Sequence, residues 1–317
     1  MTVETTQIPA YRTFPVQVAR VQRLSPSFLR VTFTGPELDA FASNGFDQRI
    51  KVMLPLPGRG ILDCPAGEDW YGAWRSLPPE RQMPIRTYTV RAARPELHEV
   101  DVDFVLHGAT GPASAWAEHA AAGDEVVLVG PNAHFSGPTG GFEWHPPADA
   151  SCLLVAGDET AVPAICAIVE ALPEGTHARV LLEVPVAGDA LDVATPRGVE
   201  VTWLPRSTGN GAPAARRGAL LTAAVVAAVG DLGDRLAPSP AADLADVDVD
   251  IDIDIDSGIL WEVPDGPVPT GSSGVYAWLA GEAGVVKGLR RHLVQEAGVD
   301  RRSVAFMGYW REGRDSD

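Results

Sequence analysis

The feature that most constrains the fold is a change of secondary-structure pattern near "HPPADA", residues 145–150. Before it, six short apolar segments are separated by turn residues, a pattern typical of a closed antiparallel barrel. Only one helix is expected in that part, over the alanine-rich "GPASAWAEHAAA". After it, apolar strands alternate with helical segments, which indicates a parallel sheet with crossover helices. We therefore predict an N-terminal β-barrel domain over residues 12–145 and an α/β domain over residues 146–317.

A low-complexity insertion at about residues 231–258 interrupts the second domain. It contains "LADVDVDIDIDIDSG", with seven aspartates between Asp243 and Asp256. Like charges at every second position repel one another, which disfavours ordered packing as a strand. Two interpretations stay open. The tract is either a solvated or loosely docked insertion or a calcium-binding segment, and glycine comes only after the repeat, which argues against a calcium loop.

Composition excludes several classes of function. The net charge of −17 disfavours nucleic acid and anionic membranes as partners. No apolar run is long enough to span a bilayer, and the N-terminus shows no signal-peptide pattern, so a cytoplasmic protein is expected. Three cysteines without close pairing (Cys64, Cys152 and Cys166) also favour a reducing compartment. Neither CxxC nor HExxH spacing occurs, so no protein-ligated metal site is expected.

The stretch "MPIRTYTVR", residues 83–91, is the first candidate binding motif. On a strand, Arg86 and Tyr88 share one face, and Thr87 and Thr89 share the other. A guanidinium pairs with phosphate oxygens, an aromatic ring stacks on a flat heterocycle, and a hydroxyl hydrogen-bonds to a polar ring edge. Together these groups suit a flavin nucleotide. The alternative is an ordinary barrel strand that is rich in Tyr and Thr because of their β-propensity.

Two further stretches carry the same kind of signal. "DVDFVLHGATGPASAWAEH" predicts a strand, a glycine-rich turn and a helix whose N-terminus, with Ser114, offers an anion site. His107 in that turn is more typical of a structural histidine. "LLVAGDETAVPAICAIVEAL" predicts a buried strand, a turn opened by Gly157, and a helix, an arrangement that suits a dinucleotide. Asp158 and Glu159 in the turn are expected to cap the helix or meet ribose hydroxyls.

Taken together, "RTYTVR", "DVDFVLHGATGPASAWA", "AGDETAVPAI", "YAWLAGEAGVVKGLRRHL" and "GYWREG" resemble the siderophore-interacting proteins. These are flavin-dependent ferric-siderophore reductases related to ferredoxin–NADP reductases, and the resemblance covers residues 12–313 apart from the insertion. It implies an FAD-binding barrel followed by a nicotinamide-binding α/β domain. By motif, the residues implied to hold FAD are Arg86, Thr87, Tyr88, Thr89, Asp103, Val105, His107, Ala113 and Ser114. Those implied to face NAD(P)H are Gly157, Asp158, Glu159 and Thr160. Tyr309 and Trp310 match a C-terminal segment near the flavin.

The resemblance also suggests where substrate binds. Ferric siderophores are often anionic, and Lys51 and Arg311 match motif positions expected to be basic. Asn132 stands in "GPNAHF" where members often carry arginine in "GPRG", which indicates a less anionic substrate. The alternative for Lys51 and Arg311 is a role in surface solubility only.

The implied activity is reduction of a ferric siderophore, because hard oxygen chelators hold Fe²⁺ far more weakly than Fe³⁺. NADH or NADPH would pass hydride to FAD, and FAD would pass single electrons to iron, so no acid–base side chain is required. Arg206 is a candidate for a 2′-phosphate and NADPH, whereas Glu183 or Asp189 would favour NADH. Two alternatives remain: a general flavin or ferredoxin-linked reductase, and a non-catalytic siderophore or haem carrier. A monomer is expected.

Overall fold

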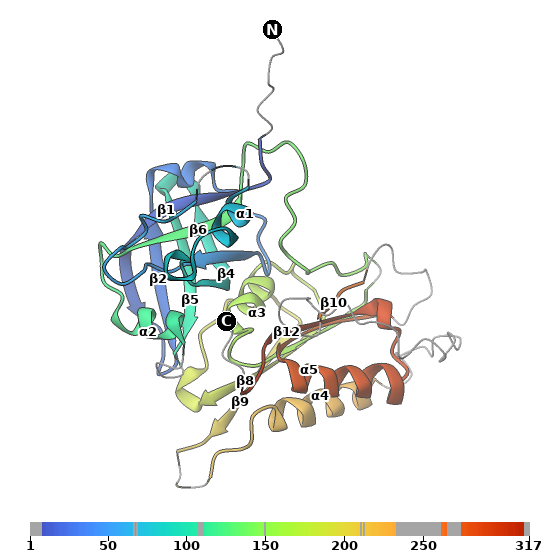
Figure 1. Cartoon of the computed structure of the whole chain (residues 1–317). Coiled ribbons are helices and arrows are strands. Elements are labelled where there is room, and N and C mark those ends of the chain that lie inside the picture. The colour runs from blue at the N-terminus through green and yellow to red at the C-terminus, as the bar shows by residue number, and fades with distance from the viewer. Residues whose placement is uncertain are drawn as a thin grey trace. The chain divides into compact units, whose positions relative to one another are not determined.

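A computed structural model gives the fold of the chain. It describes residues 8–65, 67, 69–106, 111–148, 150–209, 211, 213–232, 261–264 and 274–313. These residues form two compact units, one ending at Phe142 and the other beginning at Glu143. Each unit is shown in Figure 1 and is described here by itself. The aspartate-rich tract lies outside the described residues.

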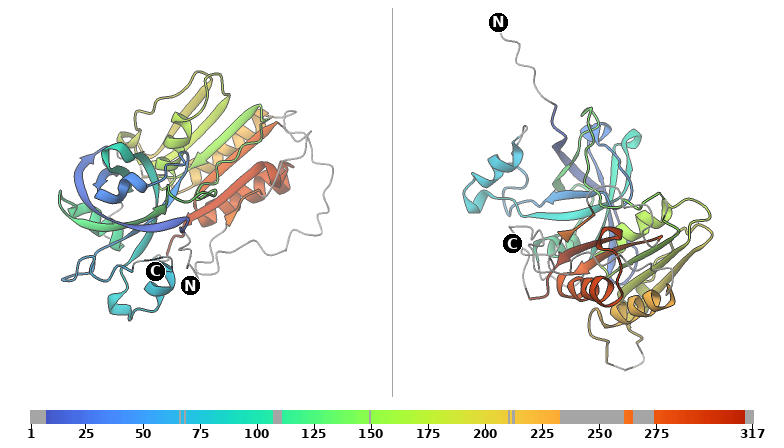
Figure 2. Two further views of the ribbon diagram at one scale, coloured as in Figure 1. Left: turned by 90° about the horizontal axis from the view of Figure 1, so that it is seen from above. Right: turned by 90° about the vertical axis from the view of Figure 1, so that its right-hand side faces the viewer.

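The first unit is a closed six-stranded barrel, as predicted. Its strands are β1 (Tyr11–Arg23), β2 (Phe28–Thr34), β3 (Arg49–Met53), β4 (Ile85–Arg94), β5 (Glu99–Val105) and β6 (Glu125–Pro131). They close in the order β1-β2-β5-β4-β3-β6, and every neighbouring pair is antiparallel. The left-hand view of Figure 2 shows the strands closing on themselves. Closure removes the exposed strand edges that an open sheet would present.

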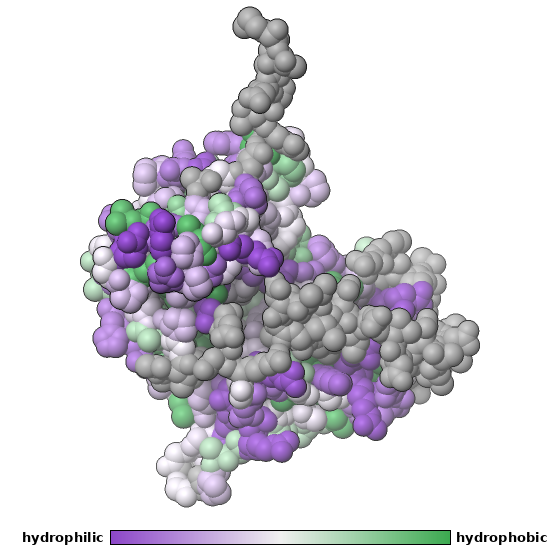
Figure 3. Space-filling view, viewed as in Figure 1, coloured by the Kyte–Doolittle hydropathy of each residue, from purple (hydrophilic) through white to green (hydrophobic). Residues whose placement is uncertain are grey.

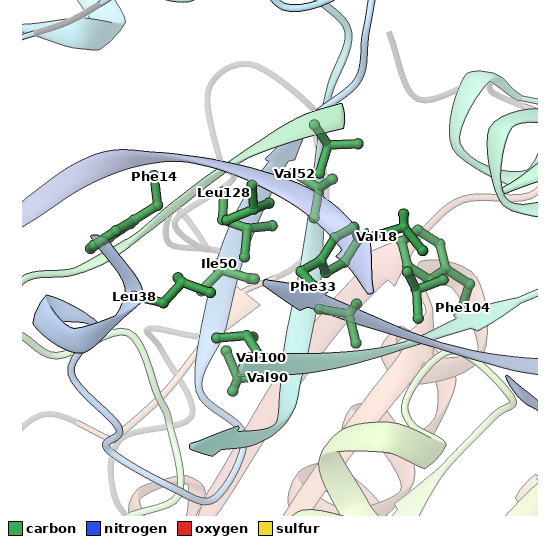
Figure 4. Close-up of a cluster of buried hydrophobic side chains, with 14 of the residues drawn as sticks. Phe14, Val18, Phe33, Leu38, Ile50, Val52, Val90, Val100, Phe104 and Leu128 are labelled. Atoms are coloured by element: carbon green, nitrogen blue, oxygen red, sulfur yellow. The ribbon is translucent and has the colours of Figure 1, made fainter. Parts of the chain in front are cut away.

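Alternating residues of these strands fill the barrel. Phe33, Val100 and Phe104 are among the fully or almost fully buried side chains of this core, which Figure 4 shows converging between the strands. The alternation is visible along β4, where Val90 is buried in the core and Thr87 is exposed. A bulge between Val90 and Ala92 shifts the β4–β5 register. Beyond it, Ala93 packs against the core again.

The expectation of a single helix in this unit was wrong. The expected helix forms as α2 (Pro112–His119), but the long connection between β3 and β4 adds α1 (Trp70–Arg75). Asp69 caps α1 by accepting a hydrogen bond from the Gly72 amide at 2.9 Å. Aromatic packing rather than an alanine-rich sequence stabilises this helix, since Trp74 packs on the cluster around Met53 and Met83. Three 3₁₀ turns complete the unit: η1 (Pro36–Ala40), η2 (Pro79–Arg81) and η3 (Pro95–Leu97).

The second unit is built on a six-stranded sheet in the order β10-β12-β11-β7-β8-β9. Its strands are β7 (Cys152–Gly157), β8 (Ala178–Val186), β9 (Val199–Ser207), β10 (Trp261–Glu262), β11 (Val275–Glu282) and β12 (Val304–Trp310). Five strands are parallel, as predicted, and the edge strand β10 is antiparallel to β12. Because parallel strands share an orientation, their carboxyl ends meet at one edge of the sheet.

Helices cover both faces of this sheet (Figure 1). On one face, α4 (Ala219–Leu232) and α5 (Ala283–Arg290) pack on a core that includes Leu154, Leu279 and Phe306. The other face carries α3 (Val162–Glu170), which is almost wholly buried. Among the described residues, the other short elements are η4 (Ala187–Asp189), the π-helical turn η7 (Arg291–Glu296) and η8 (Arg301–Ser303). Layers of this kind follow from apolar strands with crossover helices.

Hydrophilic residues dominate the coloured surface in Figure 3, and hydrophobic residues form small patches between them. Single large hydrophobic side chains such as Leu62 and Tyr71 are exposed in the β3–β4 connection. Across the described ranges, none of the helices combines the length and apolar character that crossing a bilayer requires.

Candidate functional site

The outer face of β3 and β4 brings together two of the predicted site residues. Lys51 lies opposite Thr87 in the β3–β4 register, and its Nζ donates a hydrogen bond to Thr87 Oγ1 at 2.8 Å. Both residues are exposed, whereas Thr89, further along the same face of β4, is 6% exposed. The candidate substrate cation on β3 therefore lies beside the candidate flavin strand β4. Alternation along β4 explains this placement, because every second residue points outward.

Tyr88 lies on the other side of β4. Its ring packs against Phe104 with centroids 4.3 Å apart, at the margin of the barrel core. Burial raises the pKa of the Tyr88 phenol, although the positive charge of Arg86 opposes that shift, so the phenol stays neutral. Arg86 donates a hydrogen bond from Nη1 to the Ile85 carbonyl at 2.8 Å. The predicted pairing of Arg86 with Tyr88 on one face agrees with this geometry, and their contact with flavin stays a prediction.

Asp103 is held by arginines from both neighbouring strands. Arg30, its register partner on β2, donates from Nε and Nη2 at 2.7 and 2.8 Å. Arg91 on β4 contributes a longer contact of 3.8 Å to the same carboxylate. The Asp103 side chain is only 1% exposed, so its charge is compensated within the protein. Two guanidinium groups therefore meet at this one carboxylate.

Further ion pairs lie on the same face of β5, on the side of Asp103 toward Glu99. Glu99 and Asp101 lie at alternate positions of β5 and pair with Arg20 and Arg94. Hydrogen bonds from Arg20 and Arg94 lower the pKa of Glu99 to about 2. Here two carboxylates meet two guanidinium groups, so these charges balance. Arg30 and Arg91 lie at the other end of this face, at Asp103, where β5 leads toward α2.

Helix α2 carries the predicted residues Ala113 and Ser114. Gly111 precedes the helix in an extended conformation and has no side chain to cap it, and Pro112 occupies the first turn. Ala113 and Ser114 are 6% and 5% exposed. Trp116 anchors α2 by packing on Phe33 and Phe104 with centroid distances of 6.1 and 5.6 Å. Val105, at the end of β5, is half-buried, and His107 lies outside the described residues.

Asn132, the residue that departs from the family motif, is committed to the backbone. It is 4% exposed, its Nδ2 donates to the Pro9 carbonyl at 3.0 Å, and its Oδ1 accepts from the His134 amide at 3.1 Å. Its amide therefore fixes the chain that follows β6. Without a positive charge, it adds nothing to the binding of an anionic substrate.

In the second unit, Asp158 follows β7 and ties three strand ends together. Its Oδ1 accepts from the Thr160 amide and hydroxyl at 2.9 and 2.6 Å, and its Oδ2 accepts from the Glu282 amide at 2.8 Å. The Trp310 indole Nε1, at the end of β12, donates to Oδ2 at 2.9 Å. Burial and the neighbouring charge of Glu159 raise the pKa of Asp158 to about 6, although the hydrogen bonds from Thr160 and Trp310 oppose that shift.

The Glu159 side chain belongs to a second buried cluster at the same edge, together with Arg206 and Glu183. Arg206 donates two hydrogen bonds to it, at 2.7 and 2.8 Å, and a third to Glu183 at 3.2 Å. Arg217 approaches Glu159 to 3.0 Å. Burial alone would lower the pKa of Arg206, but its bonds to Glu159 and Glu183 outweigh burial and raise it, so Arg206 stays charged. This guanidinium is 9% exposed and already paired.

The other residues proposed to select the cofactor are buried too. Glu183 is fully buried and accepts hydrogen bonds from the Gly218 and Leu221 amides at 2.6 and 2.9 Å, where α4 begins. Asp189 is also fully buried and accepts from the Val186 amide at 3.2 Å. Gly157 has no room for a side chain, since a Cβ there would lie 2.6 Å from the Ala161 Cβ.

The C-terminal candidates lie on and after β12. Tyr309 stacks on Trp261 with centroids 6.0 Å apart, and Trp310 lies beneath the Arg217 guanidinium, which is 4.5 Å from the ring centroid. Arg311 is exposed directly after the strand. Lys51 belongs to the first unit and Arg311 to the second, so each is a separate candidate for substrate binding.

Sequence reasoning assigned no role to Arg30 or Arg217, which complete these clusters. Strand register was the available signal for Arg30, because an inward–outward pattern shared by β2 and β5 aligns it with Asp103. No comparable signal exists for Arg217, which lies in a loop before α4 and reaches Trp310 through the fold alone.

These features define a class: an antiparallel barrel with a charged outer face, followed by a parallel-sheet unit whose carboxyl edge is lined by a polar turn. A solved ferredoxin reductase of carbazole 1,9a-dioxygenase shares this fold, with a TM-score of 0.59 at 15% identity over 96% of this chain and 71% of that chain. Residues 17–135 match the siderophore-interacting FAD-binding domain, and residues 150–313 match the siderophore-interacting protein family. The chain therefore belongs to the siderophore-interacting proteins.

The names of similar proteins agree with this family assignment. The ferric vibriobactin reductase ViuB of Vibrio cholerae is 30% identical over 311 residues, covering 96% of this chain and 93% of that protein. The NADPH-dependent ferric-chelate reductase of Escherichia coli is 33% identical over 156 residues, 49% of this chain and 55% of that protein. A siderophore utilization protein from T. fusca has a TM-score of 0.67 at 25% identity, covering 99% of this chain and 98% of that chain. The protein is an FAD-dependent oxidoreductase of this family.

Proposed function

We propose that this protein is a cytoplasmic, monomeric ferric-siderophore reductase that takes electrons from NADH or NADPH through FAD. The observation that carries the proposal is the 2.8 Å hydrogen bond between Lys51 and Thr87, which holds a candidate cation for an anionic chelate against the candidate flavin strand. Relatives named for ferric vibriobactin and ferric-chelate reduction support the substrate class. One of them is named as NADPH-dependent, which supports a nicotinamide donor.

The residues of the barrel fit FAD chemically. Arg30 and Arg91 bring two guanidinium groups to the Asp103 end of the outer face, and guanidinium groups pair with phosphate oxygens such as those of a pyrophosphate. Thr87 and Thr89 bring hydroxyls on the same face, and Tyr88 brings an aromatic ring on β4. Bound FAD would supply the exchange between two-electron and one-electron chemistry. The chain's own residues hold the cofactor and attract the chelate.

The direct test is anaerobic reduction of the purified yellow protein by NADH, NADPH or reduced ferredoxin, followed by trapping of Fe²⁺ with ferrozine from several ferric chelates. Flavin bleaching by a nicotinamide nucleotide and Fe²⁺ release from ferric siderophores are expected. A flavin that no donor bleaches refutes the reductase, and a protein that binds chelate but no flavin is a carrier.

Lys51 offers a sharper test, because the chain has only two lysines, Lys51 and Lys287. Lys51→Gln is expected to raise KM for an anionic ferric siderophore about fivefold, the equivalent of about 1 kcal/mol for a solvent-facing charge contact. Lys287→Gln, on the exposed side of α5, is the matched control and is expected to leave KM unchanged. Equal KM values for the two variants would remove Lys51 from the substrate site.

Asn132 favours one alternative, a flavin reductase with broad substrate use, because a neutral amide replaces a cation there. In that case neutral and anionic ferric chelates would be reduced with similar kcat/KM. A preference for anionic siderophores that Lys51→Gln abolishes supports the siderophore reductase.

A further inference from the structure

The indole of Trp310 is held from two directions by the turn that follows β7. Its Nε1 donates to Asp158 Oδ2 at 2.9 Å, which fixes the edge of the ring. The guanidinium of Arg217 lies over the ring at 4.5 Å from the centroid, which covers one face. Arg217 is itself held at 3.0 Å by Glu159, the residue next to Asp158. Adjacent residues of one turn therefore determine both the edge and the face of the indole.

We call Asp158, Glu159 and Arg217 around the Trp310 indole the clamp. The clamp is stiff because its two carboxylates are buried and each is held by several hydrogen bonds. Asp158 and Glu159 are 2% and 1% exposed. Three donors besides Trp310 hold the Asp158 carboxylate: the amide and hydroxyl of Thr160 and the amide of Glu282. Glu159 is likewise fixed by two hydrogen bonds from Arg206. A carboxylate held at this many points cannot follow a moving indole, so the indole takes its position from the carboxylate.

Trp310 is half-buried, so the residue is not enclosed in the core. The Arg217 guanidinium covers one face of the indole and the Asp158 carboxylate binds its edge, which fixes the orientation of the ring. An indole of fixed orientation suits stacking with a flat conjugated ring.

We propose that Asp158 and Arg217 are positioning residues that orient the Trp310 indole as a stacking surface for the planar ring of a redox cofactor. The proposal rests on the proposed function, because the reaction supplies the flat rings of flavin and nicotinamide. It assigns Asp158 a role other than contact with the nucleotide. The turn after β7 then acts on the reaction through Trp310.

A double-mutant cycle in the holoenzyme tests this directly. Asp158→Asn and Trp310→Phe are each expected to slow single-turnover flavin reduction by NADH or NADPH about tenfold, which corresponds to about 1.4 kcal/mol, the scale of one charge-assisted hydrogen bond. The double variant is expected to be no slower than Trp310→Phe alone, because both changes remove the same interaction. Effects that multiply to about a hundredfold would show that Asp158 acts independently of Trp310 and overturn the proposal. Arg217→Met with Trp310→Phe gives a second cycle if Asp158→Asn does not fold.

Near-UV circular dichroism gives a readout that does not depend on activity. The spectrum of Trp310→Phe subtracted from that of the parent isolates the Trp310 contribution among eight tryptophans. Asp158→Asn is expected to reduce that contribution by at least half. Asp189→Asn, which removes another buried carboxylate of this unit, is expected to leave it intact. A Trp310 contribution that survives both Asp158→Asn and Arg217→Met refutes the clamp. A parent protein that no nucleotide reduces refutes the proposed function instead, and this spectrum still decides on the clamp.

Discussion

The buried cation Arg206 provides the most stringent test of how the second unit is stabilised. Arg206→Met keeps most of the side-chain volume and removes the charge, which leaves Glu159 and Glu183 in place at 1% and 0% exposure. Removing one partner of a buried ion pair costs about 3–5 kcal/mol, because the remaining charge loses both water and its counter-ion. The contacts that Glu159 and Glu183 keep in the variant put its expected cost near the lower limit of this range. Glu159 keeps Arg217 at 3.0 Å, and Glu183 keeps the two amides at the start of α4.

We therefore expect Arg206→Met to lower the free energy of unfolding of the second unit by about 3 kcal/mol. For a unit of this size that loss corresponds to a fall in Tm of roughly 6–12 °C. Near-UV circular dichroism reports on both units, since Trp70, Trp74 and Trp116 belong to the first, whereas flavin fluorescence follows the first unit. A change in the dichroism transition without a change in the flavin transition therefore identifies unfolding of the second unit, since the two units need not unfold together. The flavin transition is expected to move little.

Arg216 is the matched control, because it is an arginine ten residues away in the chain that is exposed. Arg216→Met is expected to change stability by less than about 0.5 kcal/mol. A second comparison isolates the uncompensated charge. Adding Glu159→Gln to Arg206→Met should recover part of the loss, because one buried charge then disappears. Equal stability of the two single arginine variants would refute the view that Arg206 compensates buried carboxylates.

Three further predictions concern other parts of the chain. Because the pKa of folded Asp158 is raised from 3.8 to about 6, burial of its charge is destabilising above pH 6 and this penalty disappears as the pH falls toward 4. Most of this penalty is relieved between pH 7 and pH 4, so urea unfolding should show the parent gaining about 2 kcal/mol relative to Asp158→Asn over that range. Parallel pH profiles of the two proteins would contradict this. Gly157→Ala forces a Cβ to 2.8 Å from the Ala280 carbonyl and should destabilise by about 1–3 kcal/mol, whereas Gly230→Ala, in open space on α4, should be neutral or stabilising in the same thermal melt. Arg91→Met should raise the Kd for FAD about tenfold in a flavin-fluorescence titration, whereas Arg94→Met, which removes the partner of Glu99 and Asp101, should change it less than about twofold.

Much of the architecture was predictable, because local pattern and tertiary structure agree. Strand alternation around "RTYTVR" placed Tyr88 and Thr87 on opposite sides of β4, and the packing of Tyr88 against Phe104 confirms it. The switch from short strands to alternating strands and helices predicted the barrel and the parallel sheet. Helix α1 was missed because "WYGAWR" carries glycine and three aromatic residues, and contacts with distant residues such as Met83 stabilise it.

The partners of the charged site residues were not predictable from spacing alone. Arg206 was a candidate for a 2′-phosphate, yet the fold brings it to Glu159, 47 positions earlier in the chain. Trp310 and Asp158 are 152 positions apart and meet only because β12, β11 and β7 are neighbours in the sheet. Sequence patterns identify the residue types that a site uses, whereas their pairing depends on strand order, which no local signal in this chain reveals.

The placement of Lys51 has a practical consequence for work with the purified protein. Amine-directed reagents find only two side-chain targets here, and one of them lies against Thr87 on the candidate flavin strand. Labelling with a succinimidyl dye, or coupling to an amine-reactive sensor chip, would therefore modify the candidate substrate surface in a large share of the molecules. Reversible acylation carried out with and without a ferric chelate would turn that liability into a footprint of the site.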